Sequence, residues 1–102
     1  MQCDVHVNPD TAQDYAPFLL DVQTDLLAEL DTRVVVPLVR ASTFGRRASR
    51  LHPEFTVDGE RVVMATHLIA GIRRAGLGPH VGSLASQRDA VIAAVDVLLS
   101  GV

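Results

Sequence analysis

The sequence of 102 residues contains no lysine, no tryptophan and a single cysteine, Cys3. One cysteine can form neither an internal disulfide nor a zinc site by itself, so the fold has to be stabilised by its core. Because the aromatic residues are three phenylalanines and one tyrosine, that core must be aliphatic. Cys3 lies in an alternating run with Val5 and Val7, and we expect it to be buried as a small apolar side chain.

The chain also lacks a long hydrophobic run and a basic amino-terminal leader. No stretch reaches the length of a transmembrane helix, and the start Met-Gln-Cys-Asp does not resemble a signal peptide. We therefore expect a cytoplasmic protein that makes no contact with membranes. The length predicts one domain over residues 1–102, and a core of this size would gain stability from association into a dimer.

The common motifs of catalytic and metal sites are absent. No serine lies in a glycine elbow, and the glycines between residues 71 and 82 lack the Gly-Lys-Ser/Thr ending of a phosphate-binding loop. The histidines do not show the i, i+4 spacing of a helical metal site. We expect no catalytic residue, no metal and no cofactor. The four histidines are His6, His52, His67 and His80.

Charge is distributed unevenly along the chain. The net charge of −3 disfavours direct binding to nucleic acid. Residues 1–31 contain seven acidic and no basic residues, whereas residues 40–53 contain four arginines and no acidic residue. This arginine-rich segment is either a solvated loop or a docking site for an acidic peptide, because guanidinium groups pair well with carboxylates. Its arginines are Arg40, Arg46, Arg47 and Arg50.

Hydrophobic patterns predict several strands in the first three quarters of the chain. We expect a hairpin around the turn Asp58-Gly59, since that dipeptide suits a tight type I′ turn. Pro37 has no N–H, so its strand is expected at a sheet edge or bulged there. Residues 71–83 are rich in glycine and are predicted to be mostly loop. The predicted strands are residues 2–8, 18–23, 33–38, 55–57, 61–66 and 68–72.

A helix is predicted at the carboxy-terminal end. The run Ser86-Gln87-Arg88-Asp89 resembles a capping box, and Gly101 sits where a helix usually ends on glycine. Ser100 falls on the polar face of this helix, one turn after Asp96. An apolar stripe on another face needs a sheet to cover it, which predicts an α+β fold with a small barrel-like or strongly twisted sheet. The stripe comprises Leu84, Val91, Val95, Leu98 and Val102.

Five segments resemble the CcdB family of type II toxin–antitoxin toxins. The order and spacing of these segments match that family across essentially the whole chain. The resemblance implies a small SH3-like antiparallel β-barrel with one C-terminal α-helix, assembled as a homodimer. The segments are Met1-Gln2, residues 20–27 (LDVQTDLL) followed by 33–38 (RVVVPL), residues 49–53 (SRLHP), residues 58–60 (DGE), and the helix that ends in Gly101-Val102.

The resemblance also implies a function. Toxins of this family bind the GyrA subunit of DNA gyrase, trap the gyrase–DNA cleavage complex, act in plasmid maintenance and are neutralised by a CcdA-like antitoxin. Such a protein poisons an enzyme and is not an enzyme itself. The resemblance places the gyrase contact at the end of the helix and at a nearby apolar pair. The matching residues here are Leu26, Leu27, Asp96, Leu99, Ser100, Gly101 and Val102.

Ser100 departs from the family pattern, which has a tryptophan at this position. An exposed tryptophan supplies a large contact area and cation–π attraction, and losing such an anchor costs about 2 kcal/mol or more of binding free energy. The departure leaves an alternative: a family member with weakened or lost gyrase poisoning that acts as an antitoxin-binding module. A MazF-like ribonuclease toxin on the same barrel is a further alternative. It would use Arg40, Thr43, Arg50, His52 and His67.

Overall fold

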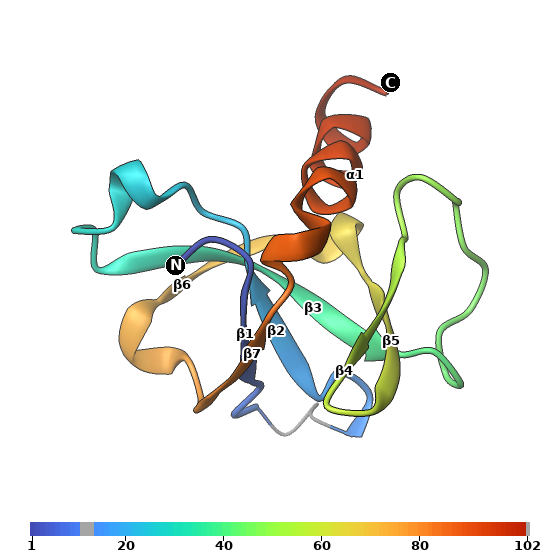
Figure 1. The fold of residues 1–102 in the computed structure, drawn as a ribbon, viewed down its shortest axis with the longest axis horizontal. Coiled ribbons are helices and arrows are strands. Elements are labelled where there is room, and N and C mark those ends of the chain that lie inside the picture. Colours follow the sequence, from blue (N-terminus) through green and yellow to red (C-terminus); the bar gives the residue numbers. More distant parts are fainter. Residues whose placement is uncertain (11–13, 102) are drawn as a thin grey trace.

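In a computed structural model that describes residues 1–10 and 14–101, an antiparallel sheet curls below a single α-helix (Figure 1). The predicted α+β fold, a small antiparallel barrel with one C-terminal helix, is confirmed. The strands of the described part are β1 (Asp4–Val7), β2 (Phe18–Asp21), β3 (Thr32–Arg40), β4 (Glu54–Val57), β5 (Glu60–Met64), β6 (Ala70–Arg73) and β7 (His80–Ser83), and the helix is α1 (Arg88–Ser100).

The longest strand, β3, organises the sheet. The strand order is β4-β5-β3-β2-β1-β7, and β6 also pairs with β3. Along one side β3 pairs with β2. Along the other side it pairs first with β6, over residues 32–35, and then with β5, over residues 38–40. This change of partner within one strand allows the sheet to curl around the core.

Pro37 lies at the point where β3 changes partner. It is paired with Leu19 of β2, and its carbonyl accepts the N–H of Ala65 at 3.0 Å. The N–H and C=O of one strand residue point to the same side, so the missing N–H faces the break between β6 and β5. The prediction that the strand of Pro37 lies at an edge or is bulged there is therefore wrong, since Pro37 pairs with Leu19 without a register shift. β3 is paired on both sides, and the proline occupies a place where no ladder donor is needed.

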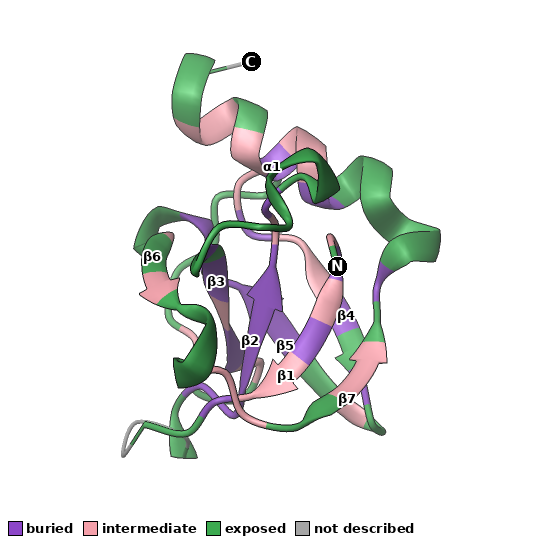
Figure 2. Cartoon of the chain, turned by 90° about the vertical axis from the view of Figure 1, so that its left-hand side faces the viewer, coloured by how far each residue is buried: buried purple, intermediate pink, exposed green. Residues whose placement is uncertain are grey.

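The core lies between the sheet and the first half of α1. Val91 and Ala94 are buried against strand residues such as Leu20 and Leu38. Exposure then rises along the helix, which extends away from the sheet towards its carboxy-terminal end (Figure 2). The predicted apolar stripe is thus buried at its start and only half-buried at Val95 and Leu98. The last residue of the stripe, Val102, lies outside the described residues.

Two local predictions are wrong. Residues 80–83 form strand β7 instead of a loop, because pairing with the distant strand β1 overrides the weak strand preference of a glycine-rich segment. The capping box is not formed, since the chain enters α1 through a 3₁₀ turn over Ala85–Gln87 and the N-cap residue Gln87 makes no side-chain capping bond. The amide of Ala85 instead donates to the hydroxyl of Ser83, at 3.1 Å.

Predictions that rest on one or two neighbouring residues are confirmed. Asp58 and Gly59 connect β4 to β5 with φ angles of 51° and 79°, as a type I′ turn requires. Gly101 ends α1 with a φ of 77°, and its amide donates to the carbonyl of Val97 at 2.9 Å. Cys3 is 1% exposed.

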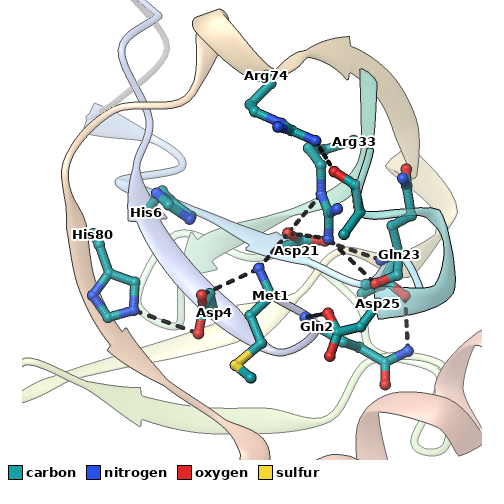
Figure 3. A network of polar contacts seen from close by, with 12 residues as sticks. Met1, Gln2, Asp4, His6, Asp21, Gln23, Asp25, Arg33, Arg74 and His80 are labelled. Carbon is teal, nitrogen blue, oxygen red and sulfur yellow. Dashed lines mark hydrogen bonds and ion pairs between the residues drawn. The ribbon is translucent and has the colours of Figure 1, made fainter. Parts of the chain in front are cut away.

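A buried ion pair joins β2 to β3, and sequence reasoning missed it. Asp21 is 1% exposed and accepts hydrogen bonds from Arg33, which contributes Nη2 at 2.7 Å and Nε at 2.9 Å (Figure 3). The second oxygen of Asp21 accepts the amide of Gln23 at 3.0 Å. The sequence did offer a sign of this pair, because Asp21 and Arg33 each lie in a strand segment that is otherwise largely apolar. A pair buried this deeply is stable only while each partner keeps the other.

We predict that Arg33→Met lowers the free energy of unfolding by about 3–5 kcal/mol, because Asp21 would keep a buried charge and lose its buried cation, which leaves it only the more distant ammonium of Met1 at 3.5 Å. Urea denaturation checks this. Arg61→Met is the matched control: Arg61 pairs with Glu54 at the surface, and its loss is expected to cost less than about 1 kcal/mol. Equal losses for the two variants would contradict a structural role for the buried pair.

Candidate partner-binding site

Two apolar segments that the sequence predicted as contact residues are exposed. Leu99 at the end of α1 is 78% exposed, and Leu26, in a turn between β2 and β3, is 91% exposed. Leu27 beside it is 47% exposed. In Figure 1 the turn and α1 extend from the same side of the sheet at separate places. The structure therefore places both segments on one side of the molecule without joining them into a single patch.

The end of α1 is closed by its own backbone contacts. The hydroxyl of Ser100 donates to the carbonyl of Asp96 at 2.7 Å, which places Ser100 one turn after Asp96 as predicted. Both side chains are exposed. Because the Ser100 hydroxyl is bonded within the helix, this position offers a partner little contact area. Leu99 is the large apolar side chain of the helix end.

Hydrogen bonds from neighbouring side chains fix the backbone of the turn that carries Leu26 and Leu27. A 3₁₀ helix over Asp25–Leu27 begins at Thr24, whose hydroxyl accepts the amide of Leu26 at 3.4 Å. Gln23 donates from Nε2 to the carbonyl of Leu27 at 3.1 Å and accepts the amide of Val34 on Oε1 at 2.9 Å. The exposed leucines thus stand on a turn whose backbone is fixed to β3.

Arg33 and Arg74 also hold the backbone of this turn in place. Arg33 donates to the carbonyl of Gln23 at 3.4 Å, so the buried ion pair reaches the base of the turn. Arg74, just after β6, donates to the carbonyls of Ala28 and Leu30 at the other end of the turn. The turn is therefore attached at both ends to neighbouring strands.

Gln2 links the turn to the start of α1. Its amide donates to Asp25 at 2.9 Å, and its side chain donates to the carbonyl of Val22 at 3.2 Å. Arg88, the first residue of α1, donates to the side-chain oxygen of Gln2 at 2.8 Å. The two exposed apolar segments are thus connected through polar contacts at their bases, although their leucines lie apart.

The predicted arginine-rich segment forms a loop over residues 41–53, here called the arginine loop. Arg40, at the end of β3, pairs with Glu60, and Arg47 pairs with Glu54 at 2.7 Å. Arg61 also binds Glu54, at 2.6 Å. Hydrogen bonds from Arg61 and then Arg47 hold the pKa of the Glu54 carboxyl below its usual range. The hairpin β4–β5 therefore engages two of the four predicted arginines in ion pairs.

Arg46 and Arg50 differ from the other two arginines. Both are exposed, and neither forms an ion pair with a residue that the structure describes. Their guanidinium groups are available to carboxylates from outside the chain. Of the segment predicted to bind an acidic peptide, these two positions are the ones whose charge is not already balanced.

The histidines form two pairs that the sequence analysis did not foresee. His52 and His67 are hydrogen-bonded, with 2.9 Å between Nε2 and Nδ1. His6 and His80 are in edge contact, with ring centroids 5.5 Å apart, and His80 lies 3.4 Å from a carboxylate oxygen of Asp4. Burial, and then the neighbouring His67, lowers the pKa of His52. Residues far apart in sequence form these pairs, so spacing along the chain gives no sign of them.

The five groups named for a ribonuclease are largely engaged with one another or with the sheet. Thr43 donates to the carbonyl of Arg40, and Arg40 pairs with Glu60.

Within residues 1–10 and 14–101, histidine, cysteine and acidic side chains nowhere form a group of three that could hold a metal ion. In the same part of the chain, no helix is both long and apolar enough to cross a membrane.

Comparisons with known proteins identify a family and a shared fold. A family model described as CcdB protein matches residues 2–101. No curated protein matches the sequence significantly. Among solved structures, the Mycobacterium tuberculosis toxin MazF-mt6 is similar, with a TM-score of 0.73 and 19% identity, over 94% of this chain and 95% of that chain. At this level of identity the likeness concerns the fold alone.

We predict that Leu26→Ala and Leu99→Ala each change the free energy of unfolding by less than about 0.5 kcal/mol, because both side chains lie in solvent. Urea denaturation of the purified chain checks this. Leu20→Ala is the control and is expected to cost about 2–5 kcal/mol, since Leu20 is fully buried. A loss above about 1 kcal/mol at Leu26 or Leu99 would show that these side chains are covered and not free for a partner.

Proposed function

Because the chain belongs to the CcdB family of toxins of toxin–antitoxin systems, we propose that it acts on DNA gyrase. As a homodimer it binds the GyrA subunit and traps the gyrase–DNA cleavage complex, and a CcdA-like antitoxin neutralises it. It is a poison of an enzyme and carries out no catalysis itself. This function requires an exposed contact surface on a rigid support.

The exposed leucines are the observation that carries the proposal. Leu99 and Leu26 leave most of their apolar surface in water, which costs free energy that a partner would recover by covering them. Both stand on fixed supports: Leu99 on α1, and Leu26 on a turn attached to Gln23 and Arg74. Rigid apolar anchors of this kind lower the entropy cost of association. Leu27, Asp96, Gly101 and Val102 complete the proposed gyrase contact.

Ser100 favours a second candidate function, in which gyrase poisoning is weakened and the chain serves as an antitoxin-binding module. Serine has no ring to stack on a partner, and its hydroxyl is already bonded to the carbonyl of Asp96. Losing an anchor of that size corresponds to about thirtyfold in affinity. The fold, the arginine loop and the dimer remain sufficient for an antitoxin in this case.

The antitoxin contact is proposed at the arginine loop. Arg46 and Arg50 are its primary residues, since Arg40 and Arg47 already pair with glutamates of the hairpin. An acidic disordered segment would bind there through guanidinium–carboxylate pairs. The ribonuclease alternative has only the shared fold in its favour, and a shared fold does not carry a shared activity.

We predict that the protein, incubated with gyrase, ATP and supercoiled plasmid, produces linear DNA after the trapped complex is denatured and digested. Ser100→Trp is expected to lower the toxin concentration needed by about thirtyfold, because it adds an aromatic anchor on the exposed face. Ser86→Trp, the same change at an exposed serine before the other end of α1, is the control and is expected to have no effect.

The outcomes separate the candidate functions. Absence of linear DNA from both the natural protein and Ser100→Trp at micromolar concentration would overturn the gyrase proposal. Trapping by Ser100→Trp alone would support the weakened antitoxin-binding module. Cleavage of cellular transcripts on expression, without trapped gyrase, would support the ribonuclease alternative.

We predict that Arg50→Glu weakens binding of an acidic antitoxin segment by about tenfold or more, because it replaces an unpaired cation with an anion. The probe is the carboxy-terminal peptide of the antitoxin encoded beside this toxin, and isothermal titration at low and high salt measures the affinity. Arg73→Glu, an equal charge change at an exposed residue of β6, is the control. Equal losses for the two variants would show a general charge effect and contradict docking at the loop.

A further inference from the structure

The hydrogen bonds of the His52–His67 pair determine where the protons lie. Ala48, in the arginine loop, donates its backbone N–H to Nδ1 of His52 at 2.9 Å. A backbone N–H can only donate, so Nδ1 of His52 carries no proton. The proton of His52 is therefore on Nε2, from which it is donated to Nδ1 of His67 at 2.9 Å. His67 in turn carries its own proton on Nε2.

This arrangement has no place for an additional proton. A proton added to Nδ1 of His52 would face the N–H of Ala48. A proton added to Nδ1 of His67 would face the N–H of His52, and moving the His52 proton to Nδ1 would only transfer the conflict to Ala48. Protonation of either ring therefore breaks one of the two hydrogen bonds. The chain of contacts is complete only while both rings are neutral.

These contacts fasten the arginine loop to a 3₁₀ turn over Thr66–Leu68, which follows β5 and carries His67. The amide of His52 also donates to the carbonyl of Ala48, at 2.9 Å, and Thr66 donates its hydroxyl to the carbonyl of Leu51. Phe44, near the start of the loop, packs edge-on against both rings, with centroid distances of 5.0 Å to His52 and 6.4 Å to His67. The segment between Phe44 and His52 contains Arg46, Arg47 and Arg50.

We propose that the His52–His67 pair is an acid-labile latch, which holds residues 44–52 against the turn over Thr66–Leu68 while both rings are neutral and releases them when either ring is protonated. We call it the histidine latch. It concerns the arginine loop of this chain whatever partner that loop binds, so it does not depend on the proposed function.

The surroundings of the latch favour its neutral form. His52 is 9% exposed, and burial followed by the neighbouring His67 lowers its pKa. No described carboxylate or guanidinium of the loop, β3 or α1 contributes to that shift, so nothing nearby compensates a charge on His52. His67 is exposed, which lets protons reach the pair from solvent. A base whose pKa is lowered on folding contributes stability above its unfolded pKa, and that contribution falls as the pH drops below it.

The test is hydrogen exchange of the Ala48 amide, followed by NMR together with the imidazole signals, between about pH 7.5 and 5, which spans the ordinary titration of histidine. We expect the amide to be protected at the upper end. Its protection should fall by about tenfold for each pH unit below the ordinary pKa of histidine, until the released form predominates, after correction for intrinsic exchange. Amides of β3, such as that of Val39, should stay protected throughout.

Matched double variants identify the cause. His52→Gln with His67→Gln keeps donor and acceptor groups but cannot take up protons, and is expected to abolish the pH dependence at Ala48. His6→Gln with His80→Gln removes the other histidine pair and is expected to leave that dependence unchanged. Protection of Ala48 that persists after both rings of the natural protein are protonated overturns the latch, as does unchanged pH dependence in the first variant. If that variant does not fold, the titration of the natural protein decides.

Discussion

The ion pair between Asp21 and Arg33 is the constraint on which the exposed surface depends. It places two opposite charges in the interior, where neither is stable without the other and without further hydrogen bonds. Further contacts come from Gln23, through its amide and its carbonyl, and from the amino-terminal ammonium of Met1, which lies 3.5 Å from Asp21. Since Gln23 also binds Leu27 and Val34, satisfying the buried charges sets the path of the turn that follows β2. The hydrogen bonds that the buried ion pair requires thus fix the position of the exposed residues Leu26 and Leu27.

The aliphatic core explains why α1 has an unsupported second half. The sheet covers Val91 and Ala94, but the helix then leaves it, and the larger side chains Leu98 and Leu99 are increasingly exposed. A helix of this length needs tertiary packing to be stable in water, and its first turns obtain that packing. Gly101 closes the last turn without a partner chain. The helix end is therefore ordered by local bonding, which leaves its apolar side chains free for contacts beyond the chain.

Sequence patterns predicted the features that neighbouring residues determine. The Asp58-Gly59 turn depends on two residues that tolerate a positive φ. Cys3 is buried as predicted, but it lies in a turn before β1 with a φ of 71°, so strand alternation does not explain its burial. Apart from the capping box before α1, the missed features depend on residues far apart in the chain. Strand β7 exists because of β1, and Pro37 is accommodated where β3 passes from β6 to β5. No local window contains both partners of such a contact.

In the candidate site too, the charges of single segments could be read from the sequence, but their pairing could not. The sequence indicated a cationic segment, but the two glutamates that pair with half of its arginines lie on the hairpin that follows, and only the fold brings them together. The histidine latch adds a charge to this balance when it opens, beside Arg46 and Arg50, which pair with no residue that the structure describes. Consider a partner that binds the closed loop more tightly than the open loop. Its affinity must fall as the histidines of the latch are protonated, and by linkage its binding must lower the affinity of those histidines for protons. An acidic partner also favours nearby positive charge, so the sign of its coupling to the latch depends on whether it contacts the closed loop or the released one.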